Sequence, residues 1–102
     1  MKQEAHIARY AEALTAAGIE PDFDLLHRVT MACGPLIYAP ATEVLTLADL
    51  PAFRKSLIRK FGPLPAFDEA IQAAWETCAE PRYRAVLFYI LTRHFGKAAS
   101  LG

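Results

Sequence analysis

Three histidines and eleven carboxylates are the side chains that could carry acid–base or metal chemistry in this sequence of 102 residues. General acid–base catalysis needs two titratable groups close together in a partly dry cleft. His6, His27 and His94 fall on three different expected helices, and no His-x-x-x-His or His-Glu-x-x-His spacing is present for a metal ion. We therefore interpret the histidines as surface or boundary side chains, and we predict no catalytic residue, no metal and no cofactor.

Nucleophilic and phosphate-binding motifs are missing from the sequence as well. Cys33 and Cys78 belong to no Cys-x-x-Cys pair, which argues against zinc-ribbon and thioredoxin-like sites. On one helix, His27 and Cys33 would point about 120° apart, so they form no dyad. The five glycines stand singly and cannot form the Gly-rich cradle of a nucleotide site. We predict two reduced, buried thiols.

Positive charge gathers on one expected helix, where four cations are spaced to share a side: Arg54, Lys55, Arg59 and Lys60. Four later cations could extend this face: Arg82, Arg84, Arg93 and Lys97. Such a face could contact phosphates with salt-sensitive affinity, or it could be a solvated surface whose side-chain stems cover the core. The formal net charge of zero argues against a dedicated binder of nucleic acid or anionic membranes. Nucleic-acid binding is therefore kept as an alternative hypothesis.

An excess of apolar side chains points instead to protein contacts. Hydrophobic residues make up 54% of the sequence, more than one small core readily hides. A candidate interaction surface lies around the end of the second expected helix: Met31, Leu36, Ile37 and Tyr38. Methionine adapts to an interface and tyrosine keeps one end in water. The expected partner is a second copy of the chain or an unidentified protein.

The charges are distributed unevenly along the chain. Residues 1–49 carry three basic and seven acidic side chains, a net charge of −4, whereas residues 50–102 carry eight basic and four acidic ones, a net charge of +4. The two halves could cancel inside one folded monomer, or they could pair two copies head to tail.

Apolar residues at helical spacing, interrupted by Gly and Pro, predict an all-α bundle of about five helices. Their expected ranges are 3–17, 23–33, 49–61, 66–79 and 80–95. Gly18 supplies a left-handed residue after the first helix. Asp22 or Asp24 is expected to cap the second, because a carboxylate there can accept the free amides of the first turn.

Two stretches define the expected architecture. The run 85–91 is apolar on every side, which is typical of a helix surrounded by others, so we expect the C-terminal helix at the centre of the bundle. Residues 35–47 lose the helical period and include β-branched side chains, which favours an extended or irregular connection packed over the core. Residues 1–102 are expected to form one domain with a short tail at 98–102.

The sequence also predicts a cytoplasmic protein without a membrane segment. No apolar signal-peptide region follows the first residues. The longest uninterrupted apolar run has seven residues, from Ala85 to Leu91, whereas a spanning helix needs roughly 20.

Three stretches in a fixed order carry a family resemblance: 32–38 (ACGPLIY), 58–62 (IRKFG) and 82–91 (RYRAVLFYIL). With 95–97 (FGK), they resemble a group of short bacterial proteins classed as domain of unknown function family 2853. The resemblance covers nearly the whole chain and implies a compact all-α protein of bacterial origin, with no established activity, cofactor or catalytic residue. At 45–49 the chain reads LTLAD instead of a Ser-Cys-Ser-Asp-like segment, so chemistry performed by that segment in relatives is not expected here.

The leading hypothesis from the sequence is a non-enzymatic interaction module that associates with a second copy of itself. Weak nucleic-acid binding through the basic face is the first alternative. A small-ligand binder or enzyme is the second alternative, and it requires a cavity of roughly 300 Å³ or more lined by convergent polar groups.

Overall fold

The computed structural model describes residues 2–98, which contain six α-helices and two 3₁₀ helices. In chain order the elements are α1 (Lys2–Ala16), α2 (Phe23–Cys33), η1 (Gly34–Tyr38), α3 (Pro40–Glu43), η2 (Leu47–Asp49), α4 (Leu50–Phe61), α5 (Phe67–Thr77) and α6 (Arg84–Phe95). The prediction of an all-α protein is confirmed. Of the tail expected at 98–102, all but Ala98 lies outside the described residues.

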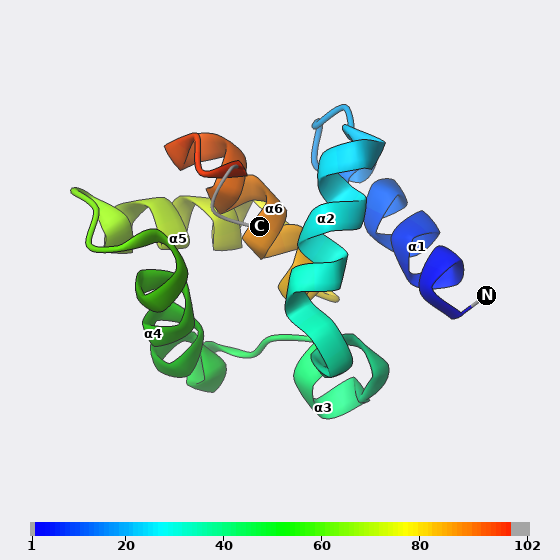
Figure 1. The fold of residues 1–102 in the computed structure, drawn as a ribbon, viewed down its shortest axis with the longest axis horizontal. Helices are drawn as coiled ribbons and strands as arrows, with labels where there is room; N and C mark the ends of the chain where they lie inside the picture. The colour runs from blue at the N-terminus through cyan, green and yellow to red at the C-terminus, as the bar shows by residue number, and fades with distance from the viewer. Residues whose placement is uncertain (1, 99–102) are drawn as a thin grey trace.

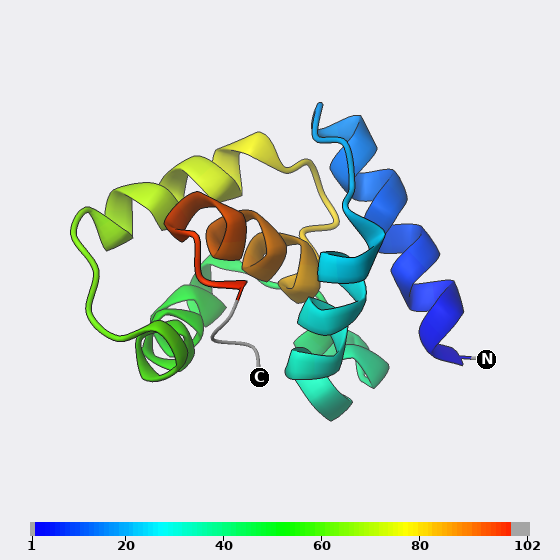
Figure 2. The ribbon, with the colours of Figure 1, turned by 45° about the horizontal axis from the view of Figure 1, so that its top comes forward.

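The helices are arranged around α6. α1 and α2 run antiparallel to one another on one side of the molecule, α4 and α5 lie on the other, and α6 lies between α2 and α5 (Figure 1; Figure 2). α6 packs against α1, α2, α3 and α5. Seven of its residues are buried: Ala85, Val86, Leu87, Phe88, Tyr89, Leu91 and Thr92. The burial of these residues accounts for the long apolar run in the helix, although Ile90 within that run is only partly buried.

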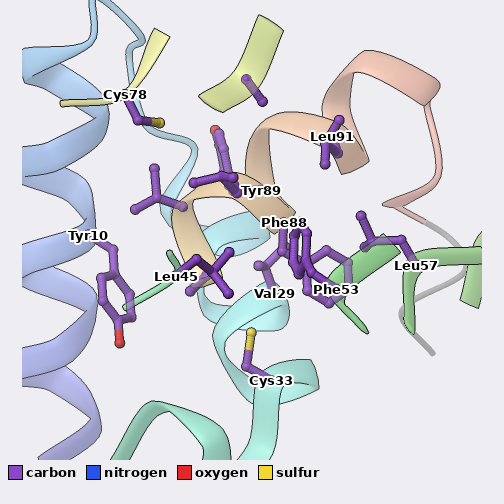
Figure 3. Close-up of a cluster of buried hydrophobic side chains, with 14 of the residues drawn as sticks. Tyr10, Val29, Cys33, Leu45, Phe53, Leu57, Cys78, Phe88, Tyr89 and Leu91 are labelled. Carbon is purple, nitrogen blue, oxygen red and sulfur yellow. The ribbon is translucent and has the colours of Figure 1, made fainter. Parts of the chain in front are cut away.

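One core connects these elements. Side chains from α1, α2, α4 and α6 meet in it, together with Leu45 from the segment between α3 and η2 (Figure 3). An aromatic contact links α4 to α6. The ring of Phe61 lies edge-on to the ring of Phe88, with the ring centroids 5.8 Å apart. Tyr10 of α1 is fully buried.

The start of α2 follows directly from its capping residue. The Asp22 carboxylate accepts a hydrogen bond from the Leu25 backbone N–H at 3.2 Å, which satisfies one of the free amides of the first turn. The Asp22 backbone N–H in turn donates to the Tyr89 hydroxyl at 2.8 Å, and this contact ties the cap to α6. The expected α2 range, 23–33, is confirmed.

Replacing Asp22 with alanine is expected to lower the free energy of unfolding by about 1 kcal/mol, because the Leu25 amide loses its side-chain acceptor. Urea denaturation followed by circular dichroism measures this change. Asp24→Ala is the matched control, since Asp24 lies in the first turn without serving as the cap. Equal losses from the two substitutions would contradict the capping role.

The connection expected to be extended or irregular at 35–47 is largely helical, and that prediction is wrong. It contains η1 and α3, and each has a proline at one of its first two positions, where the fixed φ favours helical turns. The Thr42 hydroxyl donates to the Leu36 carbonyl at 2.6 Å and so joins the two turns. The expectation that this segment covers the core is confirmed by the burial of Ile37 and Leu45.

The last helix begins later than expected, at Arg84 instead of 80. Residues 80–83 form a connection that includes a cis Glu80–Pro81 peptide bond. Tyr83 makes an isolated antiparallel bridge with Val44, and the Leu45 N–H donates to the Arg82 carbonyl at 2.8 Å. This pairing keeps Arg82 and Tyr83 extended, so the helix starts only after them.

Candidate functional site

A partly buried carboxylate joins α1 to α3. Glu43, the last residue of α3, accepts hydrogen bonds at Oε2 from the Tyr10 hydroxyl at 2.6 Å and from Arg9 Nη2 at 2.8 Å. His6 Nδ1 lies 2.8 Å from the same oxygen. The Glu43 side chain is 13% exposed. We call His6, Arg9, Tyr10 and Glu43 the Glu43 cluster.

Helix geometry explains how the three donors converge. His6, Arg9 and Tyr10 stand at positions i, i+3 and i+4 of α1, which share one face of the helix. Glu43 reaches them because α3 ends beside that face. The Tyr10 ring also lies 5.1 Å from the ring of Tyr83, next to the start of α6. The spacing on α1 is visible in the sequence, but the acceptor is more than thirty positions away, so sequence reasoning missed this cluster.

The cluster fixes the charge states of two of its members. Burial alone would raise the pKa of the Glu43 carboxyl, but the hydrogen bonds from Tyr10, His6 and Arg9 outweigh it and hold that pKa below its usual range. Burial raises the pKa of the Tyr10 hydroxyl, and the hydrogen bond to Glu43 raises it further. Glu43 is therefore ionised at neutral pH, and Tyr10 remains a proton donor.

Three groups lie near one nitrogen of His6, and the Tyr10 hydroxyl is the most distant of them, at 3.3 Å from Nδ1. Its Nδ1 lies 2.8 Å from Glu43 Oε2 and 2.6 Å from Arg9 Nη2. With a proton on Nδ1 it donates to the carboxylate, and without one it accepts from the guanidinium. The His6 ring also meets the Tyr38 ring edge-on at 5.3 Å. His6 lies at the boundary of the protein interior, as expected, but its contacts with Glu43, Arg9 and Tyr38 were not predicted.

The Glu43 cluster contains the residue types of an acid–base site, but its geometry favours a structural role. A cavity of about 360 Å³ beside α1 is lined by Arg9 and Tyr83 and not by His6, Tyr10 or Glu43. The three side chains of α1 all contact one oxygen, Oε2 of Glu43, and these contacts join α1 to α3. The arrangement therefore holds α3 against α1.

The sequence profile described as "Protein of unknown function (DUF2853)" matches residues 9–99 of the chain. The chain belongs to the DUF2853 family. No curated protein matches its sequence. The family resemblance of the sequence is thereby confirmed.

The structure of this DUF2853 chain gives the segment 45–49 a local structural role. The Thr46 N–H and hydroxyl both donate to Asp49 Oδ2, at 2.8 and 3.0 Å. The bond from the Thr46 N–H is one half of the capping box of η2, immediately before α4, and in the other half the Thr46 side chain accepts from the Asp49 backbone N–H. Hydrogen bonds from the Thr46 backbone and side chain lower the pKa of the Asp49 carboxyl.

The predicted interaction surface of the DUF2853 chain is divided in the structure. Met31 and Tyr38 line one small hollow of about 170 Å³, and Leu36 borders a different one with Lys60. Ile37 lies in the wall of the same hollow as Met31 but is almost fully buried, at 2% exposure, which corrects the expectation from the sequence. Only Met31, Leu36 and Tyr38 remain exposed.

The predicted basic face is partly engaged in contacts within the chain. Arg54 Nε donates to Asp68 Oδ1 at 2.6 Å, and the Lys60 ammonium lies 5.9 Å from the centre of the Phe88 ring. Lys55 and Arg59 are exposed on α4. Of the cations proposed to extend this face, Arg84 donates to the Thr42 carbonyl at 2.8 Å. These contacts weaken the interpretation of the face as a set of phosphate ligands.

The ion pairs that the structure shows among the described residues do not link the two charged halves of the sequence. Each of these pairs joins side chains from the same half: Arg9–Glu43, Arg54–Asp68 and Arg82–Glu80. The opposite charges of the halves are therefore not explained by these contacts.

The cysteines are free and buried, as the sequence predicts. Burial raises the pKa of the Cys33 thiol to about 11 and also raises that of Cys78, so both thiols are protonated and weakly nucleophilic at neutral pH. Within residues 2–98, no three His, Cys, Asp or Glu side chains group as metal ligands would. None of the described helices has the length and apolarity needed to cross a membrane.

Proposed function

We propose that this DUF2853 protein is a non-enzymatic interaction module that pairs with a second copy of itself through α2 and η1. The observation that carries the proposal is a group of large apolar side chains on the surface beside a closed core. Phe23, Met31 and Tyr38 are 59%, 56% and 52% exposed. Exposed aromatic and methionine side chains are typical of protein interfaces.

The spacing of these residues suits a two-fold symmetric contact. Phe23, His27 and Met31 stand at i, i+4 and i+8 of α2, and all three are exposed. Two α2 helices that cross at His27 in antiparallel directions would set Phe23 of one copy on Met31 and Tyr38 of the other. The hollow beside Met31 and Tyr38, about 170 Å³, offers space for an aromatic side chain. A two-fold interface of this kind uses the same patch on both copies.

We further propose that the module acts in the bacterial cytoplasm. The free thiols of Cys33 and Cys78 support this assignment, because a reducing compartment keeps cysteines in that state.

Sedimentation equilibrium over a range of concentrations tests the pairing. We expect a reversible monomer–dimer equilibrium, because an interface formed by a few side chains buries little surface and is weak. Met31→Glu places an unpaired charge in the interface and should raise the dimer dissociation constant at least about tenfold.

Leu47→Glu is the matched control, because Leu47 is 65% exposed and lies outside the proposed surface. It should leave the dissociation constant unchanged. A protein that remains monomeric at every accessible concentration, or a dimer that survives Met31→Glu but not Leu47→Glu, would overturn the proposal.

A further inference from the structure

A groove of about 720 Å³ lies between the segment after α3 and the connection that precedes α6. Its apolar lining consists of Val44, Leu45, Leu47, Trp75 and Pro81. Its polar lining consists of Thr46, Glu80 and Arg82. This volume is in the range of small-molecule sites, and so is the combination of an apolar wall with a few polar groups.

Arg82 is held in place before any ligand arrives. Its guanidinium stacks over the Trp75 ring at 4.3 Å from the centroid, and its Nε donates to the Trp75 carbonyl at 2.9 Å. The side chain is only 19% exposed. In the described part of the chain, the Arg82 guanidinium makes its hydrogen bond through Nε. Its terminal N–H groups therefore remain available to an acceptor.

The nearest carboxylate does not occupy those terminal groups. Arg82 Nη1 lies 3.8 Å from Glu80 Oε1, which is longer than a hydrogen bond, and the Glu80 side chain is almost fully exposed. An ion pair of this kind contributes little, because water competes for both partners. A carboxylate that forms paired hydrogen bonds with the guanidinium can replace it.

We propose that this groove binds a small monocarboxylate with an aliphatic or aromatic body. The carboxylate is bound by the terminal N–H groups of Arg82, and the body packs on Leu45, Leu47 and Trp75. Charge complementarity selects an acid over the neutral analogue of the same shape. This inference is independent of the self-association proposed above, because the groove uses none of the residues Phe23, Met31 and Tyr38.

Trp75 provides the readout, because it is the single tryptophan of the chain and lines the groove. We would titrate the protein with 4-phenylbutanoate, 4-phenylbutanamide and 4-phenylbutylamine, and follow tryptophan fluorescence. We expect a saturable change with the acid, at least about tenfold weaker binding of the amide, and the weakest binding for the amine. Equal binding of acid and amide, a preference for the amine, or no saturable change with the acid would overturn the proposal.

Two substitutions at the exposed residue Leu47 locate the site without touching the core. Leu47→Asp brings a negative charge to the groove wall, whereas Leu47→Asn has nearly the same shape without the charge. We expect the acid to bind roughly tenfold more weakly to the Asp variant than to the Asn variant. Arg82→Gln should remove the preference for acid over amide, while Arg59→Gln on the exposed face of α4 should leave it intact. Identical affinities in the two Leu47 variants, or an unchanged preference in Arg82→Gln, would show that the ligand binds elsewhere.

Discussion

Replacing Leu87 with alanine is expected to lower the free energy of unfolding by about 3 kcal/mol, within the range of roughly 2–5 kcal/mol for buried leucines. Leu87 is fully buried near the start of α6, a helix that packs against both α2 and α5. Shortening the side chain removes apolar contacts and leaves a cavity that packed neighbours cannot readily fill. Because domains of this size are stable by only about 5–15 kcal/mol, this loss is large.

Urea denaturation followed by far-ultraviolet circular dichroism measures the Leu87 effect. Leu47→Ala removes the same atoms from an exposed leucine, so its effect should stay within about 0.5 kcal/mol. If the two alanine variants were equally stable, the buried position of the C-terminal helix would be contradicted.

Replacing Glu43 with alanine is expected to cost about 2–3 kcal/mol at neutral pH. The substitution removes the acceptor shared by Tyr10, Arg9 and His6, and the Tyr10 residue is fully buried. A buried hydroxyl that loses a charged acceptor does not regain water, and the remaining neighbour of the Tyr10 hydroxyl, His6 Nδ1 at 3.3 Å, makes only a longer contact. The same denaturation experiment measures the loss, and Glu12→Ala, an exposed carboxylate on α1, is the control that should change stability by less than about 0.5 kcal/mol.

The contribution of Glu43 should also depend on pH in one direction. The pKa of Glu43 is lower in the folded protein than in the unfolded chain, so folding favours the ionised form. Its stabilising effect is complete above the unfolded-state pKa, roughly 4.3, and is lost as the pH falls through the lower folded-state pKa. The stability difference between the natural protein and Glu43→Gln should therefore be constant near neutral pH and shrink in acid. A difference that stays constant down to acidic pH would exclude the ionised cluster.

The contacts around Glu43 affect the proposed interface as well as stability. His6 of the cluster lies against Tyr38, which lies beside the hollow proposed to receive Phe23 of a second copy. α3 and η1 are too short to be stable alone, so they depend on packing against α2 and α6 and on the contacts of Glu43 and Tyr38 with α1. Loss of Glu43 would therefore disturb the position of Tyr38 more than the positions of Phe23 and Met31 on α2.

The long helices could be predicted from the sequence because their signals are local. The periodicity of α2, its cap at Asp22 and its end at Gly34 all lie within about a dozen positions. The same holds for α4, where Pro51 marks the start and Gly62 the end. The apolar run that makes up most of α6 also predicted a buried helix, and its residues are buried except for Ile90, which is partly buried.

Contacts between distant positions decided the rest. The start of α6 at Arg84 depends on the pairing of Tyr83 with Val44, and no feature of 80–83 by itself prevents a helix there. Likewise, Ile37 was placed on the surface because the sequence shows that it is apolar but not which way the turn of η1 directs it.

The sequence by itself determined the fold class, the long helices and the absence of the familiar catalytic motifs, because these depend on residue type and on spacing within a few turns. Only the tertiary structure decided that His6, Arg9 and Tyr10 share Glu43 and that Arg82 stacks on Trp75 at the wall of a groove. The physical reason is that hydrogen bonds and ring contacts act over a few ångströms in space, whereas the chain brings such groups together from positions that no local pattern connects.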